Sequence, residues 1–221
     1  MNKLIEISEQ IKSLWPSIAI GSITAEVSVK ASDEALKKAL NREAENIRQS
    51  MAVEEISKIP QLQAGRKAYK AFGKAPARYR LSSEALLRRC IKGQGMYFVN
   101  NIVEINNLVS IQSFHPICAF DREKINYPIM FRLGKKNEIY HGIGRGELNI
   151  ENLPVFADCR GALGSPTSDS ERVKITPHTT SLHMNIIAFD GKESLNLHLA
   201  GLKQLLEHYA EAKAIEQSII Q

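Results

Sequence analysis

The sequence has few cysteines, few aromatic residues and no long apolar run. Cys90, Cys118 and Cys159 are scattered and odd in number, which argues against a disulfide framework and against the paired spacing of a zinc site. No stretch reaches the roughly 18 apolar residues that can cross a bilayer. Residues 1–13 carry charges throughout and lack the apolar core of a signal peptide. We therefore expect a cytoplasmic protein with no membrane association, no metal and no other cofactor.

The composition is that of an ordinary globular chain. Its 221 residues are 43% hydrophobic and 24% charged, which is enough apolar material for one core and too little charge for disorder. We expect a single domain with a mostly helical part over residues 1–75, a core over 76–192 and a C-terminal helix over 193–221.

The positive charge is concentrated in one stretch. The chain carries a net charge of +5. Residues 66–92 contain nine basic side chains against one acid, Glu84, so this stretch carries +8 and the rest of the chain carries −3. A local basic patch is the electrostatic pattern of a nucleic-acid-binding surface, although solvated helix faces also carry such runs.

Apolar spacing predicts the secondary structure. Helical periodicity predicts helices over residues 3–14, 33–51, 56–72, 83–92, 101–113 and 193–218. Alternating or β-branched runs predict strands over residues 18–29, 117–120, 129–133, 155–157, 173–176 and 184–189. The segment 101–113 also has the β-branched content of a strand, but we favour a helix. Since helices and strands do not alternate regularly, the order predicts an α+β fold.

Two glycine-containing segments invite a functional interpretation. Residues 141–147, HGIGRGE, lack the ending of a P-loop and the spacing of a dinucleotide fingerprint, so we expect a hairpin turn. Residues 160–170, RGALGSPTSDS, follow a predicted strand and contain the hydroxyls of Ser165, Thr167 and Ser168. Their small residues would let a ligand approach the backbone amides, although a solvated turn has the same composition. A nucleophilic Cys118 assisted by His115 is a further alternative.

The basic stretch supplies the candidate RNA contacts. They lie on two predicted helices and their connection, with Tyr69, Phe72 and Tyr79 interleaved, which could pack inward or stack on bases. The candidate RNA-binding residues are Arg66, Lys67, Lys70, Lys74, Arg78, Arg80, Arg88 and Arg89.

Several segments, taken in order, resemble a known family. Residues 83–89, 100–109 and 116–125 resemble the B3/B4 domain of the phenylalanyl-tRNA synthetase beta subunit, and look even more like free-standing proteins built on that domain. Residues 72–79, 144–147, 155–158 and 164–172 agree with the same pattern. The resemblance implies a layered α+β fold with a β-sandwich-like core and flanking helices. It also implies an editing activity that hydrolyses a wrong amino acid, chiefly tyrosine, from the acceptor end of tRNA.

The resemblance carries over to particular residues only in part. Asn107 matches a polar pocket residue of the family, and residues 161–165 match its small-residue loop. Cys118 stands where the family has a histidine, and Asn106 stands where it has a threonine. The family's pocket glutamate has no clear counterpart near Pro177.

Three hypotheses follow. The first is a trans-acting deacylase of mischarged aminoacyl-tRNA, with Asn107, Ser165 and Thr167 in catalysis. Its substrate contacts would be Cys118, Glu147, Gly161, Ala162, Gly164, Ser168 and Asp169. The second, suggested by the replacement at Cys118, is a non-catalytic module that binds tRNA or a free amino acid-like ligand. The third is an assembly role for the helix over residues 193–218, so that the protein is a monomer or a homodimer.

Overall fold

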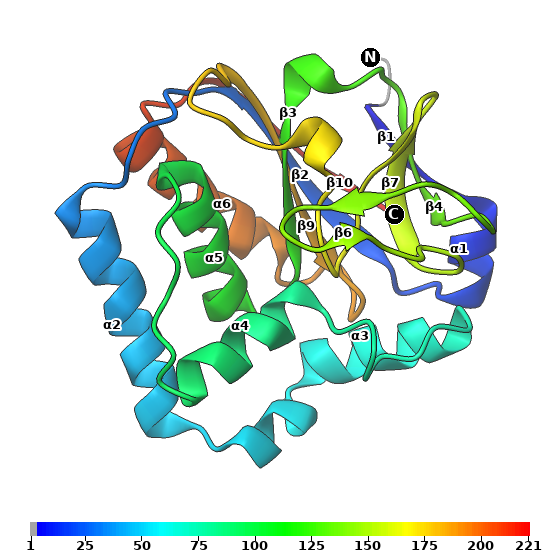
Figure 1. Cartoon of the computed structure of the whole chain (residues 1–221), viewed down its shortest axis with the longest axis horizontal. Coiled ribbons are helices and arrows are strands. Elements are labelled where there is room, and N and C mark those ends of the chain that lie inside the picture. Colours follow the sequence, from blue (N-terminus) through cyan, green and yellow to red (C-terminus); the bar gives the residue numbers. More distant parts are fainter. Residues whose placement is uncertain (1–3) are drawn as a thin grey trace.

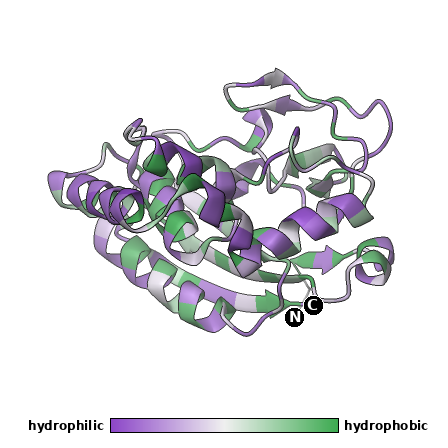
Figure 2. Ribbon diagram, turned by 90° about the horizontal axis from the view of Figure 1, so that it is seen from below, coloured by the Kyte–Doolittle hydropathy of each residue, from purple (hydrophilic) through white to green (hydrophobic). Residues whose placement is uncertain are grey.

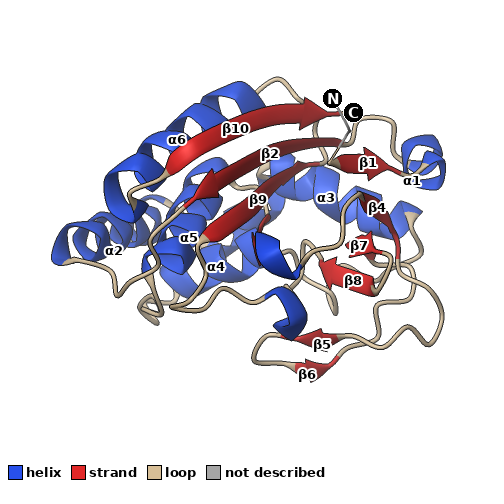
Figure 3. Ribbon diagram, turned by 90° about the horizontal axis from the view of Figure 1, so that it is seen from above, coloured by secondary structure: helices blue, strands red, loops and turns tan. Residues whose placement is uncertain are grey.

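Two β-sheets pack face to face in the computed structural model of the chain, which describes residues 4–221 (Figures 1 and 3). The antiparallel first sheet has the order β10 (Lys213–Ile220), β2 (Ala19–Glu26), β9 (Ser181–Ala188) and β3 (Ile117–Asp121). The second has the order β1 (Ile5–Ile7), β4 (Ile129–Leu133), β7 (Pro154–Asp158) and β8 (Gly161–Gly164), with β1 parallel to β4. This arrangement confirms the predicted α+β class.

Aromatic side chains fill the space between the sheets. The ring of Phe156 on β7 lies 5.7 Å from that of Phe120 on β3 and 4.7 Å from that of Phe131 on β4, measured between centroids. All three are buried, and their contacts join the two sheets into one core.

Helices cover the other face of the first sheet. α5 (Asn101–Ser113) packs on β3, and α6 (Leu195–Ala210) packs on β2. Gly21 permits this approach, since a Cβ there would lie 3.2 Å from the Leu195 side chain. α2 (Glu34–Ser50) and α4 (Ser82–Ile91) pack in turn against α5. The long helices show both hydrophilic and hydrophobic colours in Figure 2, as helices with one buried face should.

A second group of helices runs along the base of the molecule in Figure 1. The 3-10 helix η1 (Val53–Lys58) leads into α3 (Pro60–Ala71), with Pro60 at the first helical position, where its missing N–H costs nothing. α3 is anchored by Tyr69, whose ring meets Phe189 edge-on at 6.1 Å. The segment expected to be helical over residues 56–72 is therefore divided just before Pro60 into η1 and α3.

Three element predictions are wrong in part. The helix expected over residues 3–14 is β1 followed by α1 (Glu9–Leu14), with Ser8 as N-cap; Lys3 itself lies outside the described residues. The strand expected over 173–176 is replaced by the 3-10 helix η3 (Glu171–Val173) and an irregular segment. The C-terminal helix expected over 193–218 ends at Ala210, and β10 follows it and pairs with β2.

The glycine-containing segments differ from each other. Residues 141–147 form the expected hairpin, made of β5 (His141–Gly142) and β6 (Gly146–Glu147), with Gly144 and Gly146 at positive φ. Residues 161–164 are the strand β8 and not a loop. The expected helical N-terminal part supplies β1 and β2, so strands from residues 1–75 lie in the same two sheets as strands of the expected core.

Candidate functional site

Two hollows lie side by side where α4, α5 and the loop after β8 meet. The first, named here the basic groove, has a volume of about 460 Å³ and is lined by Arg80, Ser82, Ala85, Leu86, Arg88, Arg89, Lys92, Gln94, Tyr97, Asn106, Asn107 and Arg145. The second, named here the loop pocket, has a volume of about 260 Å³ and is lined by Ser82, Val99, Val103, Asn106, Ile117, Ala119, Ile143, Ser165, Ser168, Asp169, Lys174 and Ile175. Both contain Ser82 and Asn106, so the two hollows adjoin at these residues.

Asp169 is the acidic group of the loop pocket. Its Oδ2 accepts a hydrogen bond from the Ala119 amide at 3.0 Å, while its Oδ1 is shielded from solvent and has no hydrogen-bond partner within residues 4–221. Burial raises the pKa of this carboxyl to about 7, because the charged form is poorly solvated there. Asp169 can therefore hold or release a proton near neutral pH.

Ser165 shapes the loop instead of presenting a free hydroxyl. Its Oγ accepts hydrogen bonds from the Thr167 and Ser168 amides at 3.2 and 3.1 Å, and donates to the Ser168 carbonyl at 3.0 Å. The Tyr140 hydroxyl donates to the same carbonyl at 2.5 Å. These bonds fix a tight turn, which positions Ser168 and Asp169 at the pocket wall.

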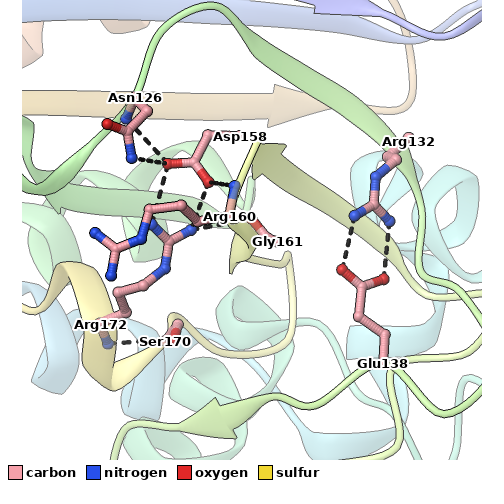
Figure 4. Close-up of polar contacts among 8 residues, drawn as sticks. All are labelled: Asn126, Arg132, Glu138, Asp158, Arg160, Gly161, Ser170 and Arg172. Carbon is pink, nitrogen blue, oxygen red and sulfur yellow. Dashed lines mark hydrogen bonds and ion pairs between the residues drawn. The ribbon is translucent and has the colours of Figure 1, made fainter.

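An ion pair fixes the far end of this loop. The Arg172 guanidinium donates to both carboxylate oxygens of Asp158 at 3.0 and 2.8 Å and to the Gly161 carbonyl at 3.0 Å (Figure 4). Asp158 also accepts from the backbone amides of Asn126 and Arg160. Burial raises the pKa of Asp158, but these hydrogen bonds outweigh it and hold the pKa below its ordinary value. Arg172 thus ties η3 and the loop to the turn between β7 and β8.

Asn106 and Asn107 both lie on α5 and both line the basic groove. Asn106 also lines the loop pocket, and its Oδ1 is buried with no hydrogen-bond partner within the described part of the chain. Asn106 therefore has unsatisfied hydrogen-bonding capacity at the junction, where a bound ligand could use it.

Cys118 is a buried residue next to the loop. Burial raises the pKa of its thiol well above the ordinary value, and the Sγ donates to the Ser165 carbonyl at 3.4 Å. His115 instead has its Nε2 2.9 Å from Asp190 Oδ1. The two side chains have separate partners, so the geometry does not support the Cys–His alternative.

Glu84 organises three of the predicted RNA-binding arginines. Its carboxylate accepts from Arg66 at 2.9 and 2.6 Å and from Arg88 at 2.9 Å, and lies 3.3 Å from the Arg80 Nε. Burial raises the pKa of Glu84, but the hydrogen bonds from Arg66 and Arg88 outweigh it and hold the pKa below its ordinary value. One buried carboxylate thus gathers three guanidinium groups, and the cluster stays positive.

Two other predicted RNA-binding side chains, Lys74 and Arg89, donate hydrogen bonds to backbone carbonyls of the chain itself. Lys74 is buried and donates to the carbonyls of Asn149 and Glu151 at 3.0 and 2.5 Å. Arg89 donates to the carbonyls of Gly95 and Gln94 at 2.5 and 3.0 Å. By contrast, Lys67, Lys70 and Arg78 are exposed and lie outside the groove lining.

The remaining predicted substrate contacts are dispersed. Thr167 is buried, and its Oγ1 lies 3.0 Å from the Tyr69 hydroxyl. Gly161, Ala162 and Gly164 belong to β8, and a Cβ at Gly164 would lie 2.5 Å from Asp169 Oδ1. Glu147 is exposed on the β5–β6 hairpin. Of the predicted substrate or catalytic residues, Ser165, Ser168 and Asp169 line the loop pocket.

Many residues that line the two hollows were not predicted as site residues, and four of them add charge or large side chains. Lys92 and Arg145 add positive charge to the groove, and Tyr97 and Val99 line the groove and pocket respectively. Lys92 falls inside the basic stretch, so its charge was a usable signal. Arg145 lies far along the chain, and only the hairpin brings it to the groove.

Metal ligands and membrane-spanning helices are absent from the part of the chain that the structure describes. Across residues 4–221 there is no group of three or more His, Cys, Asp or Glu side chains placed to hold a metal ion. Within the same residues, no helix combines the length and apolar character needed to cross a bilayer.

Comparison with known proteins identifies the family. Residues 64–201 match the model of the B3/4 domain, and since this is more than half of the chain, the protein belongs to that family. The phenylalanine–tRNA ligase beta subunit of Moorella thermoacetica is 28% identical over 113 residues, covering 49% of this chain. The match covers 14% of that ligase subunit, a small part of its length. An N-terminal fragment of the phenylalanyl-tRNA synthetase beta subunit from Pyrococcus horikoshii matches with a TM-score of 0.48 and 14% identity, covering 100% of this chain and 51% of that one.

Proposed function

We propose that this B3/4 domain protein binds tRNA in the basic groove and hydrolyses the aminoacyl ester of a mischarged tRNA in the loop pocket. The observation that carries the proposal is the shared wall at Ser82 and Asn106, which joins a cationic groove to a small, partly apolar pocket. An aminoacyl-tRNA end has the matching order of groups, with phosphates followed by an amino acid. The name of the related ligase subunit supports tRNA as the partner.

The dimensions of the loop pocket favour an aminoacyl group. Its volume of about 260 Å³ lies below the usual range for drug-sized ligands, which begins at about 300 Å³. Apolar side chains from Val99, Val103, Ile117, Ile143 and Ile175 form much of the lining. These walls suit an apolar or aromatic amino acid side chain and would discriminate weakly between close analogues.

Asp169 is the proposed general base. In its ionised form it would take a proton from a water molecule, whose oxygen then attacks the ester carbonyl carbon. The bond between that carbon and the ribose oxygen breaks, and the proton passes to the ribose oxygen. The Asn106 amide would hydrogen-bond the ester or the water. Asn107 would contact the tRNA from the groove, while Ser165 and Thr167 would act by holding the loop.

A panel of mischarged tRNAs tests the proposal. Incubation with the full chain should release the amino acid from at least one member, at a rate that rises with pH through about 7 as Asp169 ionises. Asp169→Asn should lower the rate by about 100-fold or more and remove this pH dependence. Glu147→Gln, on the exposed hairpin, is the matched control. Absence of release from every tRNA would refute the hydrolase.

A non-catalytic module is the second candidate, and the state of Cys118 favours it. The thiol is buried, its pKa is raised and its Sγ–H bonds to the Ser165 carbonyl, so it supplies no acid or base to the pocket. Tight tRNA binding without deacylation would support this alternative, as would a thermal shift with one free amino acid and none with tRNA. Binding of tRNA would place the protein in the cytoplasm, where tRNA is charged.

A further inference from the structure

Three exposed apolar side chains stand between the basic groove and the loop pocket. Tyr97, Phe98 and Val99, named here the aromatic rim, are 61%, 44% and 66% exposed. They belong to the long green connection between α4 and α5 in Figure 1. Large apolar side chains gathered on the surface of a chain usually mark a contact with a partner.

The connection is held in place by Arg89. Its guanidinium donates to the Tyr97 hydroxyl at 2.8 Å as well as to the Gln94 and Gly95 carbonyls, and its Cζ lies 3.7 Å from the centre of the Tyr97 ring. Gly93 and Gly95 provide the positive φ angles that the turn requires. Tyr97 is therefore positioned before any partner binds, which lowers the entropic cost of binding.

One face of the Tyr97 ring is available for stacking. Arg89 covers one face, yet 61% of the residue remains exposed. A planar cation beneath the ring and a second planar group above it form a stack of the kind that binds nucleobases. Lys37 lies 6.0 Å from the centre of the Phe98 ring, so the second aromatic also has a cation beside it.

The charge around the rim selects a polyanionic partner. Among the described residues, the lining of the groove beside Tyr97 contains no carboxylate. It contains five cations, which are Arg80, Arg88, Arg89, Lys92 and Arg145. A positive groove with exposed aromatics along it is the arrangement that binds single-stranded nucleic acid. Glu84 neutralises only part of this charge, and an apolar protein partner would not need such a concentration of cations.

We propose that the aromatic rim is a stacking platform for the unpaired 3′-terminal bases of an RNA, with Tyr97 as its principal residue. Tyr97 lines the groove and Val99 lines the pocket, so the rim borders both hollows and is within reach of a strand bound in either. The inference rests on the proposed tRNA binding, to which it adds the mode of recognition. Stacking on Tyr97 would orient the last nucleotide and direct its esterified ribose toward Asp169.

The test compares two forms of one uncharged tRNA, the complete molecule and the same molecule without its unpaired 3′ nucleotides. Binding of each to the full chain is measured at fixed salt. Tyr97→Ala should weaken binding of the complete tRNA by about tenfold and leave the shortened tRNA unaffected. Tyr97→Phe keeps the ring and should bind both forms as the original chain does. Leu197→Ala, at a residue 74% exposed on α6, is the matched control.

A fluorescent base gives a second measurement. 2-Aminopurine placed at the 3′ end of the tRNA should be quenched on binding the original chain and the Tyr97→Phe variant, and quenched less by Tyr97→Ala. If tRNA binds but Tyr97→Ala changes neither its affinity nor the quenching, the stacking proposal is refuted while tRNA binding stands. If neither tRNA binds, both proposals are refuted together.

Discussion

Asp169 makes the stability of the fold depend on pH in an uncommon direction. The pKa of a free aspartate is near 3.8, and burial raises that of Asp169 to about 7. Between these values the folded chain binds more protons than the unfolded chain at this site, so its contribution to stability falls as pH rises from about 4 to about 7. Above about 7 the contribution is constant.

Replacement of Asp169 by asparagine tests this linkage. The carboxamide would keep an acceptor for the Ala119 amide, but it does not titrate. The free energy of unfolding in urea should therefore fall less between pH 4 and pH 7 in Asp169→Asn than in the original chain. The difference between the two proteins should grow with pH over that range and then level off. A difference that is the same at every pH would show that Asp169 ionises normally.

Glu84 is expected to stabilise the fold more than an acid in an exposed ion pair does. Glu84→Gln would leave Arg66, Arg80 and Arg88 close together without their shared carboxylate. Removal of one partner from a buried ion pair costs about 3–5 kcal/mol, and urea unfolding should show a loss of this order. Glu45→Gln, which removes an exposed pair with Arg48, should leave the unfolding midpoint unchanged. Equal effects of both substitutions would contradict the role given to Glu84.

At the level of elements, local patterns predicted most of the helices and the inner strands. The strand over residues 129–133 and the helix over 101–113 have the predicted bounds, and the hairpin at residues 141–147 forms as expected. β10 was missed because Glu211 takes the left-handed conformation that ends α6 without a glycine or proline to mark it. β8 was missed because small residues have little strand preference, and long-range pairing with β7 decides its conformation.

The candidate site was predictable to a smaller extent than the fold. The basic stretch and the segment 165–169 do contribute to two adjoining hollows. No sequence pattern showed that the Lys74 ammonium binds carbonyls some 75 residues away. None showed that the Arg89 guanidinium donates to carbonyls in the connection after α4. Charge is visible in a sequence, whereas the partner that neutralises it is set by the tertiary fold.

Two glycines provide a test of how tightly the elements pack. A Cβ at Gly134, after β4, would lie 2.0 Å from the Ile150 carbonyl oxygen, so Gly134→Ala should destabilise the fold by at least about 1–3 kcal/mol. Gly201, within α6, has nothing within 4 Å of the added Cβ. Gly201→Ala should stabilise the chain by up to about 1 kcal/mol, because alanine favours the helix. Thermal unfolding of both variants checks the prediction, and a destabilised Gly201→Ala would contradict the described packing of α6.

The positive charge of the whole molecule is concentrated in one stretch of the chain. The net charge is +5, of which residues 66–92 carry +8 and the rest of the chain carries −3. Glu84 neutralises part of the positive charge of this stretch, and the β5–β6 hairpin places Arg145 at the groove. We therefore expect a polyanion to bind in the basic groove, with an affinity that decreases as salt is added.

The salt dependence measures how many phosphates the basic groove neutralises. The logarithm of the tRNA association constant should fall linearly with the logarithm of salt concentration, by about 0.7–0.9 for each neutralised phosphate. Arg145→Ala and Lys92→Ala should each weaken binding and make the slope less steep by about one phosphate. Lys203→Ala, on α6 and paired with Glu207, should change neither quantity. If Lys203→Ala reduced the slope as much as Arg145→Ala, tRNA would be bound by the overall charge of the protein and not in the groove. That result would contradict the proposal that tRNA extends from the basic groove to the loop pocket.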